Sequence, residues 1–448
     1  MSDPDSATRD FMEALRARNP HEPEFHQAAE EIARSVMPWY LDQSEMRRAG
    51  LLERLTEPDR MISFRVAWED DSGVVRMNRA WRVQFSHALG PYKGGLRFAP
   101  EVGPSVLKFL GLEQVLKNAL TGLPMGGAKG GADFDPHGAS RAEIGRFCRA
   151  LMAELHRHIG PDMDVPAGDI GVGPEEISLM FGEYLKLTNT WTGALTGKGC
   201  SFGGSAVRVE ATGYGCVYFC EMMLEEHGHG FEGKRVAISG SGHVALFAAE
   251  KAIDHGGQVV SLSDSNGLLV CEAGMSQDLL DRIKRVKLEK RGRLADCDSL
   301  DGAVYREGET PWGLEPDIAL PCATQNELDA DDAEALVAGG LLALCEGANM
   351  PLTPAAAERL REAEVLHGPG KAANAGGVAV SGLEQTQNAQ RLSWSRAEVD
   401  RRLQEIMRRI HGECLDSRLG EGPVSYPDCA NLAGFRRAAA AMHSFGVY

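Results

Sequence analysis

The chain has 448 residues, 43% of them hydrophobic, and a formal net charge of -17 at pH 7. A single hydrophobic core stops growing near roughly 250–300 residues, so this length predicts two domains. An acidic chain disfavours nucleic acid and anionic membranes as partners, because both attract basic surfaces.

The first residues lack the basic start and apolar run of a signal peptide, and no stretch is apolar for long enough to span a bilayer. We therefore expect a soluble, cytoplasmic protein. The 10 cysteines stand singly, without a Cys-x-x-Cys pair. That spacing predicts reduced thiols that fill the core, with no disulfide framework and no metal site.

Residues 1 to about 60 carry apolar side chains such as Phe11 and Leu15 at helical spacing, and we expect helices there. From residue 61 to 89 apolar and polar residues alternate, which indicates half-buried strands. Asp71-Ser72-Gly73 is typical of a turn between two such strands. A small sheet is therefore predicted directly after the N-terminal helices.

Two glycine-rich segments each carry a lysine, Lys93 in residues 90–97 and Lys129 in residues 123–131. We interpret both as loops in which a ligand can approach the amine, because the neighbouring residues have no bulk. Burial lowers the pKa of an ammonium group, which would let Lys129 exchange protons near neutral pH. The alternatives are an exposed surface loop, an anion-binding nest without chemistry, and a glycine hinge.

Three more polar residues accompany these lysines. Gln114 and Lys117 are three residues apart on an expected helix and so share a face. Asp169 stands among glycines, where a carboxylate beside a lysine could relay protons. Each residue taken singly is readily explained as structural. Taken together, they indicate a site for a dicarboxylate.

A dinucleotide-binding fingerprint, Gly-x-Gly-x-x-Ala, occupies Gly240 to Ala245. It follows an expected strand and opens an expected helix, and Asp264 ends the next strand. Gly240 permits the tight turn, Gly242 lets the backbone approach the pyrophosphate, and the helix N-terminus faces the phosphates. Residues 231–380 alternate short apolar runs with helical stretches, which predicts a parallel sheet covered by helices.

The type of dinucleotide is less clearly encoded. Asp264 would bind the ribose hydroxyls of NAD and repel the 2′-phosphate of NADP. A basic cluster after it could bind that phosphate, or could form a solvated helix face. Its members are Lys284, Arg285, Lys287, Lys290, Arg291 and Arg293. The balance favours NADP and leaves NAD possible.

Several ordered motifs resemble those of the bacterial, hexameric, NADP-type glutamate dehydrogenases, and together they extend over nearly the whole chain. They include Lys93-Gly-Gly-Leu-Arg-Phe98, Leu123-Pro-Met-Gly-Gly-Ala-Lys-Gly-Gly131, Val165-Pro-Ala-Gly-Asp-Ile-Gly171, Thr196-Gly-Lys198 and Lys371-Ala-Ala-Asn-Ala-Gly-Gly377. The resemblance implies a two-domain α/β fold. A substrate-binding and oligomerisation domain with a mixed sheet and helices would comprise residues 1–200 and 428–448. A Rossmann-like, doubly wound dinucleotide-binding domain would comprise residues 201–427.

The resemblance also implies an activity, the reversible oxidative deamination of L-glutamate to 2-oxoglutarate and ammonium by a homohexamer that uses NADP. Lys129 resembles the catalytic lysine and Asp169 its proton-relaying partner. The implied substrate-binding residues are Lys93, Gln114, Lys117, Gly168 and Ser381, with Lys93 and Ser381 holding the side-chain carboxylate. The implied cofactor-binding residues are Thr212, Gly240, Ser241, Gly242, His243, Val244, Asp264, Ser265, Lys287 and Asn349.

Two positions depart from the family pattern, His243 in place of the usual asparagine and Val209 in place of proline. A neutral imidazole still donates one hydrogen bond, and its protonation would make cofactor affinity depend on pH. The alternatives are an NAD-dependent enzyme, a dehydrogenase for another amino acid, and an inactive nucleotide-binding regulatory protein. Lys93 with Ser381 favours glutamate, because relatives that act on leucine or phenylalanine present apolar residues there.

Overall fold

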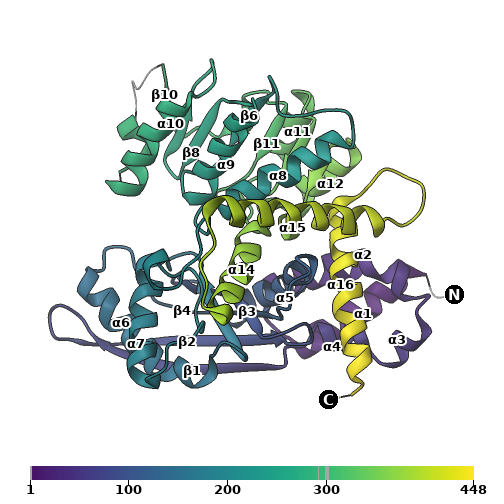
Figure 1. Cartoon of the computed structure of the whole chain (residues 1–448). Helices are drawn as coiled ribbons and strands as arrows, with labels where there is room; N and C mark the ends of the chain where they lie inside the picture. The colour runs from purple at the N-terminus through teal and green to yellow at the C-terminus, as the bar shows by residue number, and fades with distance from the viewer. Residues whose placement is uncertain (1–2, 291, 298–301, 448) are drawn as a thin grey trace. The chain divides into compact units, whose positions relative to one another are not determined.

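The computed structural model describes residues 3–290, 292–297 and 302–447, and the chain forms two compact units (Figure 1). Unit 1 comprises Met1–Arg208, Val378–Val399 and Asn431–Tyr448, and unit 2 comprises Val209–Gly377 and Asp400–Ala430. The ranges expected from the sequence placed residues 378–399 with the second domain, whereas these residues pack in unit 1. Arg291, a member of the expected basic cluster, lies outside the described residues.

Unit 1 begins with helices, as the apolar spacing predicted. They are α1 (Pro4–Arg18), α2 (Pro23–Tyr40), α3 (Ser44–Arg48) and α4 (Leu51–Leu55). Asp3 caps α1 by accepting a hydrogen bond from the Ser6 amide. Within the described part of the chain, no helix has the length and apolarity needed to cross a membrane.

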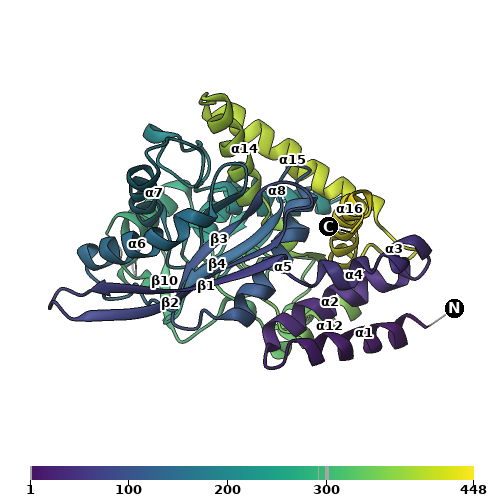
Figure 2. The same cartoon turned by 90° about the horizontal axis from the view of Figure 1, so that it is seen from below.

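A five-stranded mixed sheet follows, seen from below in Figure 2. Its strands are β1 (Arg60–Glu69), β2 (Val75–Ser86), β3 (Tyr92–Phe98), β4 (Gly127–Ala132) and β5 (Asp164–Gly168), in the spatial order β1-β2-β4-β3-β5. Strands β1 and β2 form the predicted antiparallel hairpin, and β4 pairs antiparallel with β2. Strand β3 runs parallel to both β4 and β5.

The two lysine-bearing segments are strands, so their interpretation as loops was wrong. Lys93 lies on β3 and Lys129 on β4, and every residue of both strands is buried. The reason is close backbone approach: a Cβ atom on Gly94 would lie only 1.6 Å from the Ala128 carbonyl oxygen. Glycine is required here by neighbouring backbone rather than by a turn. Both lysines are consequently held on rigid elements.

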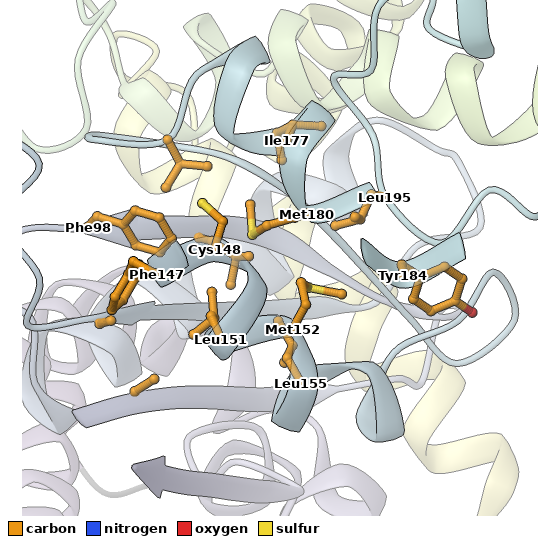
Figure 3. Close-up of a cluster of buried hydrophobic side chains, with 14 of the residues drawn as sticks. Phe98, Phe147, Cys148, Leu151, Met152, Leu155, Ile177, Met180, Tyr184 and Leu195 are labelled. Carbon is orange, nitrogen blue, oxygen red and sulfur yellow. The ribbon is translucent and has the colours of Figure 1, made fainter. Parts of the chain in front are cut away.

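Helices cover this sheet. Helix α5 (Pro104–Leu120) packs against β2 and β4. Helices α6 (Arg141–Leu155) and α7 (Pro174–Thr188) share a core with the strands, in which Phe98 contacts Phe147 edge to face (Figure 3). The predicted capping box at Ser140 is present, because its hydroxyl accepts from the Glu143 amide and the Glu143 carboxylate accepts from the Ser140 amide.

Unit 2 contains the predicted parallel sheet. Its strands are β6 (Arg235–Ile238), β7 (Gln258–Val259), β11 (Ile318–Leu320), β12 (Ala343–Cys345) and β13 (Leu366–Gly368), in the order β13-β12-β11-β6-β7. Every pair in it is parallel. The helices of this unit include α8 (Ala211–Glu225), α9 (His243–Asp254), α10 (Gln277–Lys284), α11 (Ala330–Ala338), α12 (Pro354–Glu362) and α13 (Gly370–Ala373).

One expected strand, residues 258–262, is divided between two sheets. Strand β7 belongs to the parallel sheet, whereas β8 (Ser261–Asp264) pairs antiparallel with β9 (Gly267–Val270). Strand β10 (Val304–Glu307) completes this second, three-stranded sheet. Asp264 therefore ends a strand as expected, but at the tight β8–β9 connection.

Three long helices complete the chain, α14 (Gly376–Gln390), α15 (Arg396–Asp416) and α16 (Tyr426–Phe445). Each contributes residues to both units. The Ser395 hydroxyl accepts from the Glu398 amide at the start of α15, as the sequence pattern there predicted. Most of α14, including Ser381, belongs to unit 1 and thereby to the same unit as Lys93 and Lys129.

Candidate active site

A buried ion pair joins Lys129 and Asp169 in unit 1. The Lys129 Nζ atom lies 2.9 Å from Asp169 Oδ2. Lys129 is on β4 and Asp169 directly follows β5, so their side chains meet across the intervening strand β3. Gly95 of β3 makes this possible, because a Cβ atom there would lie 2.9 Å from Asp169 Cβ and 3.4 Å from Lys129 Nζ.

The environment changes the protonation of both partners. Burial lowers the pKa of Lys129, and the charge of Asp169 only partly reverses this. Burial by itself would raise the pKa of Asp169, but the charges of Arg97 and Lys129 outweigh it and hold that pKa well below its ordinary value. Desolvation and neighbouring charge thus favour a carboxylate beside an amine that can lose its proton.

Lys93 occupies a second buried position in the same unit. Its Nζ donates to the Val165 carbonyl at 3.0 Å and to Thr196 Oγ1 at 2.7 Å. Burial lowers its pKa well below the ordinary value, with Arg208 adding to this and Glu384 opposing it. An anionic ligand beside Lys93 would restore the ammonium form, because a negative charge favours it.

Gln114 and Lys117 lie on α5 as predicted, and both side chains are buried. Gln114 Nε2 donates to Asn118 Oδ1 at 2.7 Å, and Asn118 Nδ2 donates to the Lys93 carbonyl at 3.1 Å. A Cβ atom on Gly94 would lie 3.3 Å from Gln114 Cγ, so this side chain borders β3. The α5 residues and the Lys93 strand form one connected region.

Ser381 joins the region from α14, together with residues that the sequence reasoning did not identify as site residues. Its Oγ accepts a hydrogen bond from Arg208 Nε at 2.9 Å. Arg208 is partly buried, and desolvation lowers the pKa of its guanidinium. One turn further along α14, Glu384 pairs with Lys198 at 2.7 Å, and neither side chain is exposed. The helical spacing of Ser381 and Glu384 was the available signal, since residues three apart share a face.

The charges of this region do not balance within it. Lys93, Arg208 and Lys198 are basic side chains, of which Lys93 would regain its charge with an anion beside it, whereas Glu384 is the carboxylate that pairs with Lys198. Buried charges are normally paired, because an isolated ion is costly to desolvate. The arrangement therefore fits an anionic ligand, and a carboxylate can accept from both an ammonium group and a hydroxyl.

The nucleotide fingerprint in unit 2 forms a turn that leads into the N-terminus of α9. Gly240 has a positive φ of 86°, and its amide donates to Ser263 Oγ at 2.9 Å. Gly242 is the N-cap of α9, and a Cβ atom there would meet nothing within 4 Å among the described residues. Open space before a helix N-terminus fits a pyrophosphate group. Ser241, between the two glycines, is buried.

Helix α8 packs against α9, the helix that the fingerprint opens. Gly213 of α8 packs so closely on α9 that a Cβ atom would lie 2.5 Å from the Val244 carbonyl oxygen. Thr212 precedes it in the first turn of α8. His243 is the first residue of α9. Its ring lies nearly parallel to the Phe247 ring, with 6.3 Å between the two ring centroids.

The Asp264 carboxylate accepts hydrogen bonds from two backbone amides. Its Oδ2 accepts from the Leu294 amide at 3.0 Å, and its Oδ1 accepts from the Asn266 amide at 3.0 Å. Ser265 contacts the Asn266 side chain at 3.2 Å. The Lys287 ammonium donates to the Gly292 carbonyl at 3.0 Å. Each carboxylate oxygen thus accepts one backbone amide and keeps capacity for a further donor.

Of the remaining basic cluster, Lys284 is engaged elsewhere, because it pairs with Glu250 of α9. The ammonium also lies over the Phe247 ring, 4.9 Å from its centroid. Lys284 therefore stabilises the packing of α10 on α9.

Asn374 supplies an unpartnered acceptor in unit 2. Its Nδ2 donates to the Ala348 carbonyl at 3.0 Å and to Asn349 Oδ1 at 3.1 Å. Its Oδ1 is buried and accepts from no group in the described part of the chain. Buried acceptors without a donor are rare in proteins. Asn349 follows strand β12, and Asn374 follows strand β13. Ligands of open parallel sheets bind beyond the carboxyl ends of such strands.

Comparison with known proteins places the chain in a family. The model described as Glutamate/Leucine/Phenylalanine/Valine dehydrogenase matches residues 203–446, and the model described as Glu/Leu/Phe/Val dehydrogenase, dimerisation domain, matches residues 58–186. The chain belongs to this family of amino-acid dehydrogenases.

Individual relatives resemble it along almost the whole length. An NADP-specific glutamate dehydrogenase of Escherichia coli (strain K12) is 55% identical over 438 residues, with 98% of each chain covered. An NAD(P)-specific glutamate dehydrogenase of Xylanibacter ruminicola is 51% identical, with 98% of this chain and 99% of the relative covered. The crystal structure of Plasmodium falciparum glutamate dehydrogenase superposes with a TM-score of 0.97 at 45% identity, covering 99% of this chain and 96% of that one.

Proposed function

We propose that this protein is an NADP-dependent glutamate dehydrogenase, which reversibly converts L-glutamate to 2-oxoglutarate and ammonium. The observation that carries the proposal is the buried Lys129–Asp169 pair at 2.9 Å, on the same sheet as the cationic region around Lys93. An acid–base pair and an anion site on neighbouring strands suit an amino-dicarboxylate. The near full-length similarity to NADP-specific glutamate dehydrogenases supports the same activity.

The substrate is proposed to bind through both carboxylates. Gln114 and Lys117 on α5 hold the α-carboxylate, and the backbone of Gly168 contacts the substrate. Lys93 and Ser381 hold the side-chain carboxylate. Arg208 donates to Ser381 Oγ, so the serine hydroxyl is free to turn its own proton toward that carboxylate. Leucine or phenylalanine would leave the buried Lys93 without a charged partner, which disfavours both as substrates.

Lys129 and Asp169 are proposed to move protons. The nicotinamide cofactor, when bound, accepts the hydride from the substrate α-carbon. The substrate is then an iminium ion, and Lys129 in its neutral form removes a proton from water as the water attacks it. Lys129 then holds that proton, and Asp169, as a carboxylate, relays it to the amino group, which leaves as ammonia while the carbinolamine hydroxyl loses its own proton. Burial of both groups keeps bulk water from competing for those protons.

NADP is the proposed cofactor. The proposed contacts are Thr212, Gly240, Ser241, Gly242, His243, Val244, Asp264, Ser265, Lys287 and Asn349. The similarity to NADP-specific glutamate dehydrogenases supports NADP over NAD. The Xylanibacter relative is described as NAD(P)-specific, so use of NAD remains the second candidate.

The division of labour follows from the positions of these residues. We propose that unit 1 binds the substrate and forms the oligomer, and that unit 2 binds the dinucleotide. The matched dimerisation-domain model lies within unit 1. A homohexamer is the proposed assembly, with small molecules as ligands and with neither nucleic acid nor membrane as a partner.

One assay series tests the function. NADPH oxidation is followed with 2-oxoglutarate and ammonium, then with NADH in place of NADPH, and then with branched 2-oxo acids. We expect fastest turnover with NADPH and 2-oxoglutarate. Preference for NADH or for a branched acid would replace the proposed cofactor or substrate. Tight nucleotide binding without any turnover would instead favour an inactive regulatory protein.

A further inference from the structure

A second cation shares the carboxylate of Asp169. Arg97 Nε donates to Asp169 Oδ2 at 2.9 Å, the same oxygen that Lys129 Nζ approaches at 2.9 Å. Both cations are almost wholly inaccessible, with 8% of the Arg97 and 5% of the Lys129 side chain exposed. The proposed acid–base pair is therefore part of a three-membered group with one excess positive charge.

The backbone of β3 builds this group. Gly95 and Arg97 are two residues apart and so point to the same face of the strand. Gly95 leaves the space through which Lys129 and Asp169 meet, and Arg97 reaches the carboxylate from beyond that space. Arg97 stands opposite Gly131 of β4, where a Cβ atom would lie 2.2 Å from the Arg97 carbonyl oxygen. The arginine is thus fixed by close strand packing.

A lone lysine–aspartate pair would be poorly suited to proton release. Each charge stabilises the other, and a lysine that loses its proton leaves a buried carboxylate without a counter-ion. An arginine changes this, because a guanidinium does not give up its proton in proteins. With Arg97 present, Asp169 keeps a cationic partner whether Lys129 is charged or neutral.

We propose that Arg97 is a positioning residue for the reaction: its permanent charge keeps Asp169 ionised and oriented. Of the two groups, Lys129 is then the one that loses its own proton and becomes the neutral base. This inference rests on the proposed function of Lys129 and Asp169 as the proton-transfer pair. Arg97 itself takes no part in proton transfer.

The surrounding charges agree with this role. Arg97 and Arg82 both lower the pKa of Lys129, and Asp169 raises it. Arg82 of β2 forms its own buried ion pair with Asp164, at 2.5 Å, so most of its charge is compensated. Helix α5 packs against β4 and carries buried Glu113 and Lys117 besides Gln114. Arg97 is the arginine that contacts the Lys129–Asp169 pair directly.

The pH dependence of oxidative deamination tests the proposal. In Arg97→Gln we expect the acidic limb of kcat/KM to move to higher pH by about one unit or more, because a nearby positive charge is lost. Activity should recover as the pH rises. Arg97→Lys keeps the charge only while its buried amine stays protonated, so its limb should shift no further than that of Arg97→Gln. Arg79→Gln removes an exposed arginine of β2 paired with Asp133 and should change nothing. NADPH binding and the melting temperature of each variant report on folding.

Several results would overturn the proposal. They are an Arg97→Gln limb at the wild-type pH, a loss of activity by the same factor at every pH, and an Arg97→Lys limb shifted further than that of Arg97→Gln. If Arg97→Gln does not fold, Arg97→Met, which also removes the charge, takes its place, and an unshifted limb in Arg97→Met contradicts a role based on charge.

A second measurement does not need turnover. Trace acetylation of amines by acetic anhydride over a pH series, followed by peptide mass mapping, reports the protonation of Lys129. Its labelling midpoint should rise in Arg97→Gln and rise no further than that in Arg97→Lys. An unchanged midpoint in Arg97→Gln would refute the inference. A wild-type protein without glutamate turnover would refute the proposed function instead, and the labelling result would still apply to Arg97.

Discussion

Lys198 and Glu384 form an ion pair at 2.7 Å in which neither side chain has any exposed surface. The Glu384 carboxylate also accepts from the Gly197 amide at 3.0 Å, so it anchors the segment that carries Thr196. Thr196 in turn accepts a hydrogen bond from the Lys93 ammonium at 2.7 Å. A carboxylate on α14 thereby positions a lysine on β3.

Removing one partner of this pair should destabilise the protein strongly. Glu384→Ala leaves the Lys198 ammonium buried without its carboxylate, and we expect a loss of about 3–5 kcal/mol in the free energy of unfolding. Thermal and urea unfolding measure it. Glu154→Ala removes an exposed ion pair with Arg157 in the same unit and should change stability by about 0–1 kcal/mol. Equal effects of the two substitutions would contradict the buried-pair interpretation.

Substitution of the proposed base should affect chemistry more than binding. In Lys129→Ala we expect kcat to fall by about 10²–10⁴-fold, the usual contribution of general acid–base catalysis. NADPH affinity, measured by fluorescence titration, should remain near the wild-type value, because Lys129 lies in unit 1 and the fingerprint in unit 2. Near-normal turnover of Lys129→Ala would remove it from the mechanism.

Lys93 should determine the preference for a side-chain carboxylate. Lys93→Met removes the ammonium that donates to Thr196 and Val165. We expect kcat/KM for glutamate to fall by about 10²-fold or more, as for the loss of a charged hydrogen bond. Norvaline, which lacks the carboxylate, should be affected much less. Parallel losses for both substrates would argue that Lys93 is structural.

The thiols should differ sharply in reactivity. Cys200 is exposed, whereas the other cysteines of the described chain are buried. Burial raises the pKa of the Cys148 thiol to about 12, so little thiolate exists at pH 8. Iodoacetamide on the native protein should therefore modify Cys200 quickly and the buried thiols slowly, as mass mapping would report. Cys200→Ser should abolish the fast phase, and a persisting fast phase would locate a second reactive thiol.

His243 should make cofactor affinity depend on pH. The residue opens α9 beside Gly242, where phosphates are proposed to bind. An imidazole gains a positive charge as the pH falls below about 6.5. Because that charge attracts phosphate, the KM for NADPH should fall toward acidic pH, and His243→Asn should flatten this trend. Identical pH profiles of KM for both proteins would exclude the effect.

Local patterns were sufficient for the elements that rest on short-range contacts. The N-terminal helices, the capping box at Ser140 and the parallel sheet around Gly240 were all predicted, and the structure contains them. Helical spacing, cap residues and the strand–glycine–helix motif express interactions between residues that are close along the chain. These are the features that a single sequence encodes directly.

The interpretation of the glycine-rich segments failed for a physical reason. Glycine serves turns and close strand packing equally well, and the Gly94–Ala128 approach that distinguishes them joins residues far apart in the sequence. The division of residues 258–262 between two sheets has the same origin, because strand pairing depends on which neighbours are available.

The amino-acid sequence by itself determined the motifs that carry the family resemblance, the dinucleotide fingerprint and the identity of Lys129 as a candidate base. Only the tertiary structure decided that Lys129 and Arg97 contact the same carboxylate oxygen of Asp169. It also decided that Glu384 and Arg208 border the region of Lys93. Charge compensation in a buried region depends on groups brought together from separate strands and helices. No local spacing rule records which of those groups become neighbours.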